Sequence, residues 1–216
     1  MKIQWYGHSC FIIETDNGTR LLTDPYGESV GYPRHELDVD AATISHGHHD
    51  HNDDTMLMGT PTVLRGAGTW EIGGVKITGI ASWHDENQGA LRGENTIFLF
   101  EADGLCLAHL GDLGVVPETE MIAKIGKVDI LLAPVGGTYT IGPKEACEIA
   151  NLTRANVLIP MHYQTSAVTL SKPLYSVEQL ISTAKDCSIH RLNQSSCVIT
   201  PASLGEDRLL VLDYVR

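Results

Sequence analysis

The residues best suited to chemistry form one short run, His46-Gly47-His48-His49-Asp50-His51. Imidazole and carboxylate side chains together suit Zn²⁺, Fe²⁺ and Mn²⁺. His46, His48, Asp50 and His51 lie too close in sequence to bind one tetrahedral ion without strain in the loop. They can serve two adjacent ions if alternate side chains point to different sides. The run therefore predicts a binuclear metal site, and the alternative is a solvated histidine-rich loop with adventitious metal affinity.

Three further candidate ligands, His84, Asp112 and His162, lie farther along the chain. Each follows an apolar run at the position where a strand is expected to end, as do Asp24 and His46. Ligands at strand ends are held by a rigid scaffold, while the neighbouring loops shape a pocket. Taken singly, such residues are more often hydrogen-bonded histidines or turn aspartates. A carboxylate that bridges two cations has to lie between them, and Asp112 is the best candidate.

Strands dominate the elements that must position these residues, with hairpin signals at Asp16-Asn17-Gly18 and Asp103-Gly104. The expected strands are residues 2–5, 10–14, 20–23, 41–45, 75–80, 96–101, 105–110, 128–134, 156–160, 197–200 and 208–215. The expected helices are residues 117–124, 143–152 and 176–186. Helices that are interspersed among strands, without strict alternation, predict a layered α/β sandwich and not a doubly wound parallel sheet.

Length and charge narrow the class of protein. The 216 residues suit a single domain spanning 1–216. The chain has 15 basic and 27 acidic residues, a net charge of −12 with histidine neutral. This balance disfavours nucleic acid and anionic membranes as partners, because both require a basic surface.

The cysteines and the apolar segments predict a cytoplasmic location. The five cysteines are scattered and form no C-x-x-C pair, which favours a reducing compartment. The chain opens directly into strand-like alternation, without a signal-peptide pattern. No apolar run approaches the roughly 18 residues that a membrane span needs.

The run of residues 46–51, followed by His84, Asp112 and His162, resembles the signature of the metallo-β-lactamase superfamily. The resemblance extends over essentially the whole chain, from 7–10 through 23–25 to 160–163. It is closest to the compact UlaG-like branch of metal-dependent hydrolases, which is similar to the L-ascorbate-6-phosphate lactonases, and residues 134–143 are typical of this branch. The resemblance implies an α/β fold, a four-layer αββα sandwich with the site at one edge.

The resemblance also implies roles for the candidate residues. It assigns His46, His48 and His84 to a first metal ion, Asp50, His51 and His162 to a second, and Asp112 to a position between the two. Asp24 would orient a ligand imidazole by accepting its hydrogen bond. His109 is a candidate supporting partner or proton shuttle, with a packed histidine as an equal alternative. His8 is a candidate because it could face the same edge.

Two positions distinguish among activities within the superfamily. Oxygen-reducing diiron members resemble this pattern but have a glutamate where His48 stands, so His48 favours hydrolysis. Lactamases of the cysteine-ligand type have a cysteine where Asp112 stands, so lactam hydrolysis is disfavoured.

We therefore expect a binuclear metal-dependent hydrolase with two divalent ions, Zn²⁺ first and Fe²⁺ or Mn²⁺ as alternatives. Two ions about 3.5–4 Å apart lower the pKa of a bridging water and stabilise the developing oxyanion. Asp50 and Asp112 are the expected catalytic residues, and Asp50 would receive or position the proton while it remains bound to the metal. The expected substrate is an ester, lactone or phosphoester of a small molecule. The alternatives are a phosphodiesterase or nuclease of the same superfamily and a non-catalytic metal-binding scaffold.

Two expectations concern binding partners. A homo-oligomer is possible, since the chain has no long insertion that could cover a pocket. Arg92, Asn95, Lys144 and Tyr163 could contact an anionic substrate, although a solvated surface is the favoured interpretation for each.

Overall fold

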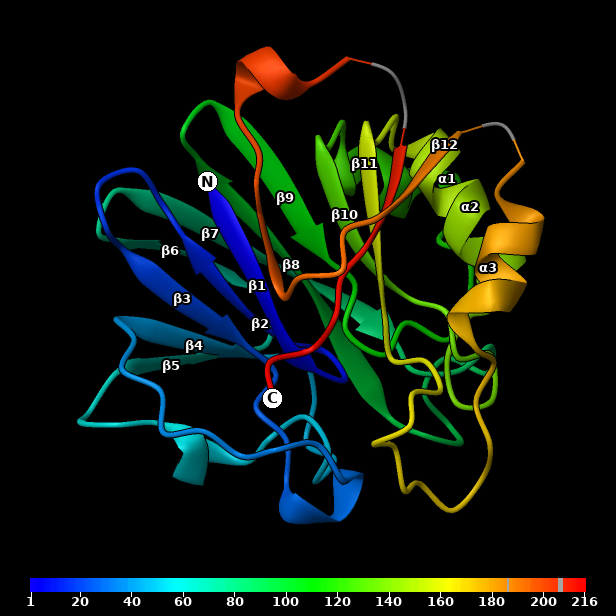
Figure 1. Ribbon diagram of the computed structural model, residues 1–216, viewed down its shortest axis with the longest axis horizontal. Helices are drawn as coiled ribbons and strands as arrows, with labels where there is room; N and C mark the ends of the chain where they lie inside the picture. Colours follow the sequence, from blue (N-terminus) through cyan, green and yellow to red (C-terminus); the bar gives the residue numbers. More distant parts are fainter. Residues whose placement is uncertain (186, 206–207) are drawn as a thin grey trace.

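A computed structural model describes residues 1–185, 187–205 and 208–216 of the chain. Within these residues the strands form two sheets (Figure 1). The first sheet has the order β13 (Ser196–Val198), β1 (Lys2–Gly7), β2 (Cys10–Glu14), β3 (Arg20–Thr23), β4 (Ala41–Ile44) and β5 (Thr62–Arg65). Pairing is antiparallel from β13 to β3 and parallel from β3 to β5.

The second sheet is larger and is also mixed. Its order is β12 (Ser188–Arg191), β14 (Arg208–Val211), β11 (Val157–Met161), β10 (Ile130–Pro134), β9 (Leu105–His109), β8 (Glu94–Ala102), β7 (Val75–Trp83) and β6 (Gly68–Ile72). The strands from β12 to β9 are parallel, and those from β9 to β6 are antiparallel. Consequently β9, β10 and β11 all end at the same edge of the sheet.

Strand alternation gives the first sheet two buried faces. Ile3 and Phe11 point toward the second sheet and pack in one core with Phe98 of β8. Ile12 and Leu22 point the other way and form a second cluster. Both faces are apolar, so a further layer must cover the outer face of this sheet.

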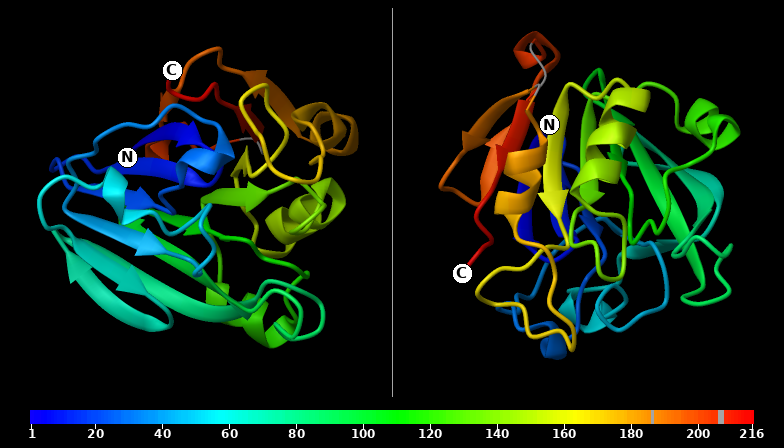
Figure 2. Two further views of the ribbon diagram at one scale, coloured as in Figure 1. Left: turned by 90° about the horizontal axis from the view of Figure 1, so that it is seen from below. Right: turned by 90° about the vertical axis from the view of Figure 1, so that its right-hand side faces the viewer.

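The two outer layers differ in structure. Helices α1 (Thr119–Ile125), α2 (Pro143–Leu152) and α3 (Val177–Thr183) lie on the outer side of the second sheet (Figure 2, right). The outer face of the first sheet is covered by two loop segments, one between β3 and β4 with the short 3-10 helix η1 (Glu28–Val30) and one between β4 and β5 with η2 (Asp54–Met56). A third 3-10 helix, η3 (Pro201–Ser203), follows β13. The predicted layered α/β sandwich is confirmed.

Most predicted elements are present with small shifts in their bounds. β2, β3 and α2 have the predicted bounds, while β7 and β8 are longer. α1 begins two residues later than predicted, at Thr119, and α3 ends at Thr183. The predicted last residue of that helix, Asp186, lies outside the described residues.

The predicted strand 208–215 is wrong beyond Val211, because the chain leaves the second sheet there and crosses to the first. Val215 N–H donates to the Trp5 carbonyl at 3.0 Å, and the Tyr214 ring packs edge-on to Trp5. β5, β6 and β12 were not predicted. In β5 and β12 most side chains are exposed, and in β6 exposed side chains alternate with half-buried ones. None of the three strands therefore contains an apolar run.

No helix within the described residues is long and apolar enough to cross a membrane.

Candidate metal centre

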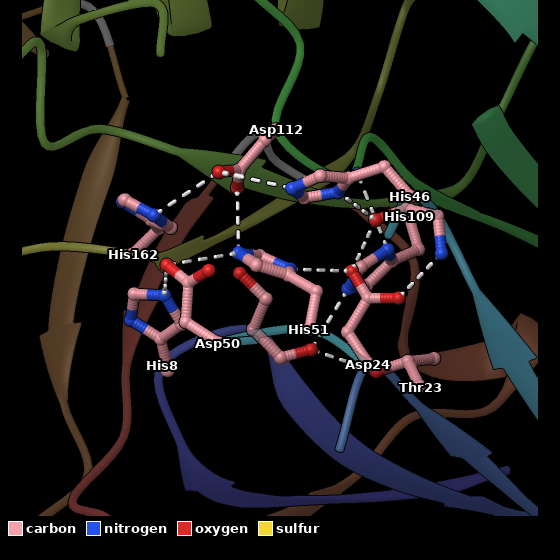
Figure 3. Close-up of polar contacts among 12 residues, drawn as sticks. His8, Thr23, Asp24, His46, Asp50, His51, His109, Asp112 and His162 are labelled. Carbon is pink, nitrogen blue, oxygen red and sulfur yellow. Dashed lines mark hydrogen bonds and ion pairs between the residues drawn. The ribbon is translucent and has the colours of Figure 1, made fainter. Parts of the chain in front are cut away.

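The candidate ligands lie at one edge of the sandwich, where strands of both sheets end. Figure 3 shows the side chains of His46, Asp50, His51, Asp112 and His162 gathered there. Asp24 follows β3, and the loop of residues 46–51 follows β4. His84, Asp112 and His162 follow β7, β9 and β11 of the second sheet. Parallel pairing brings most of these strand ends to the same edge, and β7 runs in the same direction as β9 because both pair antiparallel with β8. Residues more than a hundred positions apart therefore meet there.

The Asp112 carboxylate lies at the centre of the cluster and is buried. Its Oδ1 atom is 3.1 Å from His51 Nε2. Its Oδ2 atom is 3.3 Å from Nε2 of both His84 and His162, and 3.9 Å from His46 Nε2. One carboxylate therefore contacts imidazoles that come from both sheets.

The remaining residues form two groups around Asp112. The first set is His46, His48 and His84, and the second set is His8, Asp50, His51 and His162. Within each set, every residue has one nitrogen or oxygen atom that lies within 4.8 Å of the corresponding atoms of the other members. The structure thus brings together all seven predicted ligands. It adds His8 to the second set.

His8 is fully buried and supports two neighbours in the second set. Its Nε2 lies 3.3 Å from Asp50 Oδ2, and its ring centroid lies 4.0 Å from that of His162. Its carbonyl accepts the backbone N–H of His162 at 3.1 Å. Burial and the neighbouring His162 lower the pKa of His8 to about 3, so its imidazole is neutral at pH 7.

Asp24 holds the loop from outside the cluster. Its Oδ2 atom accepts hydrogen bonds from His51 Nδ1 at 2.8 Å and Ser45 Oγ at 2.6 Å, and Oδ1 accepts the Ser45 N–H at 2.7 Å. Ser45 Oγ also lies 2.9 Å from His46 Nδ1. Asp24 therefore orients His51 directly and His46 through Ser45, in line with the supporting role that the sequence suggested.

His109 lies close to the cluster but outside both sets. Its Nε2–H donates to the Ser9 carbonyl at 2.9 Å, and its Nδ1 accepts the Gly111 N–H at 3.2 Å. Both ring nitrogens are thus engaged in hydrogen bonds to the backbone. Of the two interpretations left open for His109, this arrangement favours a packed histidine that supports the chain at Gly111.

The charges of the cluster oppose one another. Burial lowers the pKa of His51, but the carboxylates of Asp112 and Asp50 outweigh it and raise that pKa well above its ordinary value. Burial raises the pKa of Asp112, but His162 and His51 outweigh it and hold that pKa well below its ordinary value. Burial, with His51 nearby, lowers the pKa of His46 to about 3. Without a cation, a proton on His51 offsets part of the carboxylate charge.

Two residues that shape the centre have structural roles the sequence did not reveal. Asn95 Oδ1 accepts the Asp112 N–H at 2.9 Å, while its amide donates to the Leu110 carbonyl at 2.9 Å. Asp85 follows His84 and accepts four backbone N–H groups of the next loop. Asn95 is buried, as is Tyr163, so the solvated interpretation of these two residues is wrong. An aspartate directly after a ligand was the only available signal for Asp85.

A cavity of about 500 Å³ opens onto the cluster. His48, Asp50, His84 and Asp112 form its floor, and Arg92 is among its other lining residues. Its size suits a small molecule. A ligand in this cavity would contact residues of both sets.

Comparison with known proteins places this geometry in a family. A family model described as a beta-lactamase superfamily domain matches residues 2–162. The chain belongs to the metallo-β-lactamase superfamily. A Thermotoga maritima protein of this superfamily, assigned as a Zn-dependent hydrolase, has a crystal structure that matches 99% of each chain. The TM-score is 0.82 and the sequence identity is 36%.

Curated relatives agree with the assignment. A UPF0173 metal-dependent hydrolase from Methanoregula boonei is 32% identical over 192 residues, which is 76% of this chain and 83% of the relative. A UPF0173 metal-dependent hydrolase from Bacillus cereus is 30% identical over 214 residues, covering 83% of this chain and 93% of the relative. This member of the metallo-β-lactamase superfamily is a metal-dependent hydrolase with a His/Asp cluster that could hold metal. The UlaG-like branch stays a prediction.

Proposed function

We propose that this hydrolase binds two divalent cations and hydrolyses an ester, a lactone or a phosphoester of a small molecule. The proposed ligands are His46, His48 and His84 for one ion, Asp50, His51 and His162 for the other, and Asp112 for both. The observation that carries the proposal is the position of the Asp112 carboxylate between the two sets. Its Oδ1 faces His51 at 3.1 Å and its Oδ2 faces His84 at 3.3 Å.

Unpaired polar atoms support the fit of cations to this site. Nε2 of His46, His51 and His162 and Oδ1 of Asp112 are buried without a well-aligned hydrogen bond among the described residues, although His51 Nε2 and Asp112 Oδ1 lie only 3.1 Å apart. Leaving such a group unpaired costs about 1–3 kcal/mol each. The other ring nitrogen of His46 contacts Ser45, and that of His51 contacts Asp24, so Nε2 of both rings faces the cluster. Bound cations would satisfy these atoms together.

The ligand chemistry favours zinc. Imidazole nitrogens outnumber carboxylate oxygens in the proposed sets, and none of the proposed ligands is a cysteine. Zn²⁺ accepts this mixture readily, whereas Fe²⁺ and Mn²⁺ remain compatible with it.

Divalent cations held by these residues would supply polarisation of the scissile carbonyl or phosphoryl group and a lowered pKa for a water. Asp50 lines the cavity, and its pKa is lowered because His51 and His8 outweigh its burial. It is therefore ionised at neutral pH and can orient the attacking water and accept its proton. His8, 3.3 Å from Asp50 Oδ2, holds this carboxylate in place.

The cavity and the charge favour a small molecule over a nucleic acid. A cavity of about 500 Å³ is within the range of metabolite sites. The net charge of −12 offers little to attract a phosphate backbone. Generic esters, lactones and phosphodiesters are therefore the first substrates to screen.

The test compares the wild type with Asp112→Asn, both purified without added metal or chelator. Metal content per chain is measured by mass spectrometry, and hydrolysis is assayed on the same samples. We expect near two equivalents in the wild type. In Asp112→Asn we expect reduced metal content and loss of hydrolysis, with the fold retained by circular dichroism. Asp38→Asn, at an exposed position, serves as the matched control. Less than one equivalent that zinc addition does not restore, or full activity of Asp112→Asn, would refute the proposal.

A further inference from the structure

Arg92 is a cationic side chain in the wall of the cavity that opens onto the cluster. It also lines a neighbouring cavity of about 480 Å³, together with His46, His48 and Arg65. The residue is half-buried. Among the described residues, no carboxylate lies within ion-pair distance of its guanidinium, whereas Arg34 and Arg191 each have such a partner. Its charge is therefore available to a ligand.

The loop that carries Arg92 is held in a defined shape by Asp85. The Asp85 carboxylate is fully buried and accepts the N–H groups of Asn87 and Gly89 at one oxygen and those of Leu91 and Arg92 at the other. The bond from Arg92 N–H is 2.7 Å long. An arginine on such a braced loop loses little backbone freedom when it binds an anion, so its position is preorganised.

The loop is also tied to the candidate metal centre. His84 N–H donates to the Gly93 carbonyl at 3.1 Å, and Asp85 comes directly after His84 in sequence. The same short segment thus supplies a candidate metal ligand at one end and Arg92 at the other. This links the position of the guanidinium to the floor of the cavity.

The rest of the wall suits a polar, negatively charged ligand. Ser29, Tyr139, Thr169 and Ser171 supply hydroxyl groups. Within the cavity, two divalent cations and Arg92 would outweigh the carboxylates of Asp50 and Asp112. The local charge is then opposite in sign to the acidic chain as a whole.

We propose that Arg92 binds an anionic group that the substrate carries in addition to the bond that is hydrolysed. The site therefore selects small molecules with a carboxylate or phosphate group over neutral ones. Guanidinium binds such oxyanions through paired, charge-assisted hydrogen bonds. This inference rests on the proposed hydrolase function, because that function defines the cleaved bond.

The kinetic test compares two esters that differ only in charge. Mono-4-nitrophenyl glutarate carries a carboxylate where 4-nitrophenyl valerate has a methyl group. We expect the zinc-loaded enzyme to prefer the glutarate ester, and Arg92→Gln to lower the ratio of the two kcat/KM values about ten- to hundredfold. Arg92→Lys should restore part of the ratio. Arg154→Gln is the control, because Arg154 lies in the turn before β11, at the end of that strand opposite to His162.

A binding test separates this inference from the proposed function. Glutarate and valerate are titrated into zinc-loaded protein by calorimetry, without turnover. We expect tighter binding of glutarate in the wild type and in Arg154→Gln, and loss of that difference in Arg92→Gln. Equal binding of the two acids by the wild type, or an ester ratio unchanged in Arg92→Gln, overturns the anion site. A glutarate preference that depends on Arg92, without hydrolysis of either ester, supports the anion site and counts against ester hydrolysis.

Discussion

Asp24→Asn tests whether a residue outside the cluster controls one metal position through the tautomer of its ligand. Asp24 is buried, and its Oδ1 accepts the Ser45 N–H at 2.7 Å, while Oδ2 accepts from His51 Nδ1 at 2.8 Å. In the variant, the amide oxygen has to remain opposite the Ser45 N–H, since two donors cannot face each other. The amide NH₂ then faces His51 Nδ1, which must become the acceptor. His51 can then no longer be doubly protonated, and its one remaining proton lies on Nε2, the atom that faces Asp112.

The magnitude follows from that reversal. To bind a metal ion through Nε2, His51 would have to lose the proton there and regain one on Nδ1, where it would face the amide NH₂ and have no acceptor. Loss of such a supporting partner weakens the binding of the metal. We expect zinc affinity at the His51 position to fall about ten- to hundredfold, or about 1.4–2.7 kcal/mol. The assay is competition for zinc with a chromogenic chelator, fitted to two dissociation constants.

Ser45→Ala is the matched control. It removes the Ser45 Oγ contact with His46 Nδ1 at 2.9 Å but keeps the bond between Asp24 and His51. The two variants should therefore weaken different dissociation constants. Thermal unfolding of the metal-free proteins shows whether either variant has lost its fold. Wild-type affinity for both ions in folded Asp24→Asn would refute the tautomer mechanism, as would identical effects of the two variants.

Three further predictions concern protons, packing and the braced loop. Because the pKa of His51 is raised in the metal-free protein, this imidazole is protonated at pH 7, so zinc binding should release that proton and become tighter as pH rises toward the pKa. Calorimetry in buffers of different ionisation enthalpy measures the proton release, and its absence would contradict the prediction. A Cβ at Gly136 would collide with the His162 carbonyl oxygen, so Gly136→Ala should lower the free energy of unfolding measured in urea by about 1–3 kcal/mol and reduce the metal content. Unchanged metal content would show that the backbone adapts. Asp85→Ala leaves four backbone N–H groups without their acceptor, so the free energy of unfolding should fall by about 1–3 kcal/mol and proteolytic cleavage within residues 85–93 should be faster. Resistance to proteolysis equal to that of the wild type would contradict this prediction.

The secondary structure was predictable wherever a run was apolar enough to be buried on both faces. β2 and β3 have the predicted bounds for this reason, whereas α2 was predicted from Pro143 at its first position and the helix formers that follow it. β12 was missed because three of its four residues are exposed and only pairing with β14 makes it a strand. The outer loop layer over the first sheet gave no periodic signal at all.

The sequence by itself determined the chemistry of the candidate centre. Seven residues of ligand type at strand ends predicted a cluster, and the tertiary structure brings all seven together. The signal is strong because the run of residues 46–51 is local and each distant residue follows an apolar strand. Such strand ends meet at one edge once the sheets form.

Only the tertiary structure decided what surrounds the cluster. Asn95 lies under Asp112 because β8 and β9 pair, and Asp24 reaches His51 because β3 and β4 are parallel. Arg92 faces the cavity because Asp85 folds its loop back toward His84. These contacts depend on distances between segments far apart in sequence or on loop conformation, and neither leaves a periodic pattern in the residues. Strand ends and ligand types are therefore properties of the sequence, whereas hydrogen-bond partners and pocket walls are properties of the folded chain.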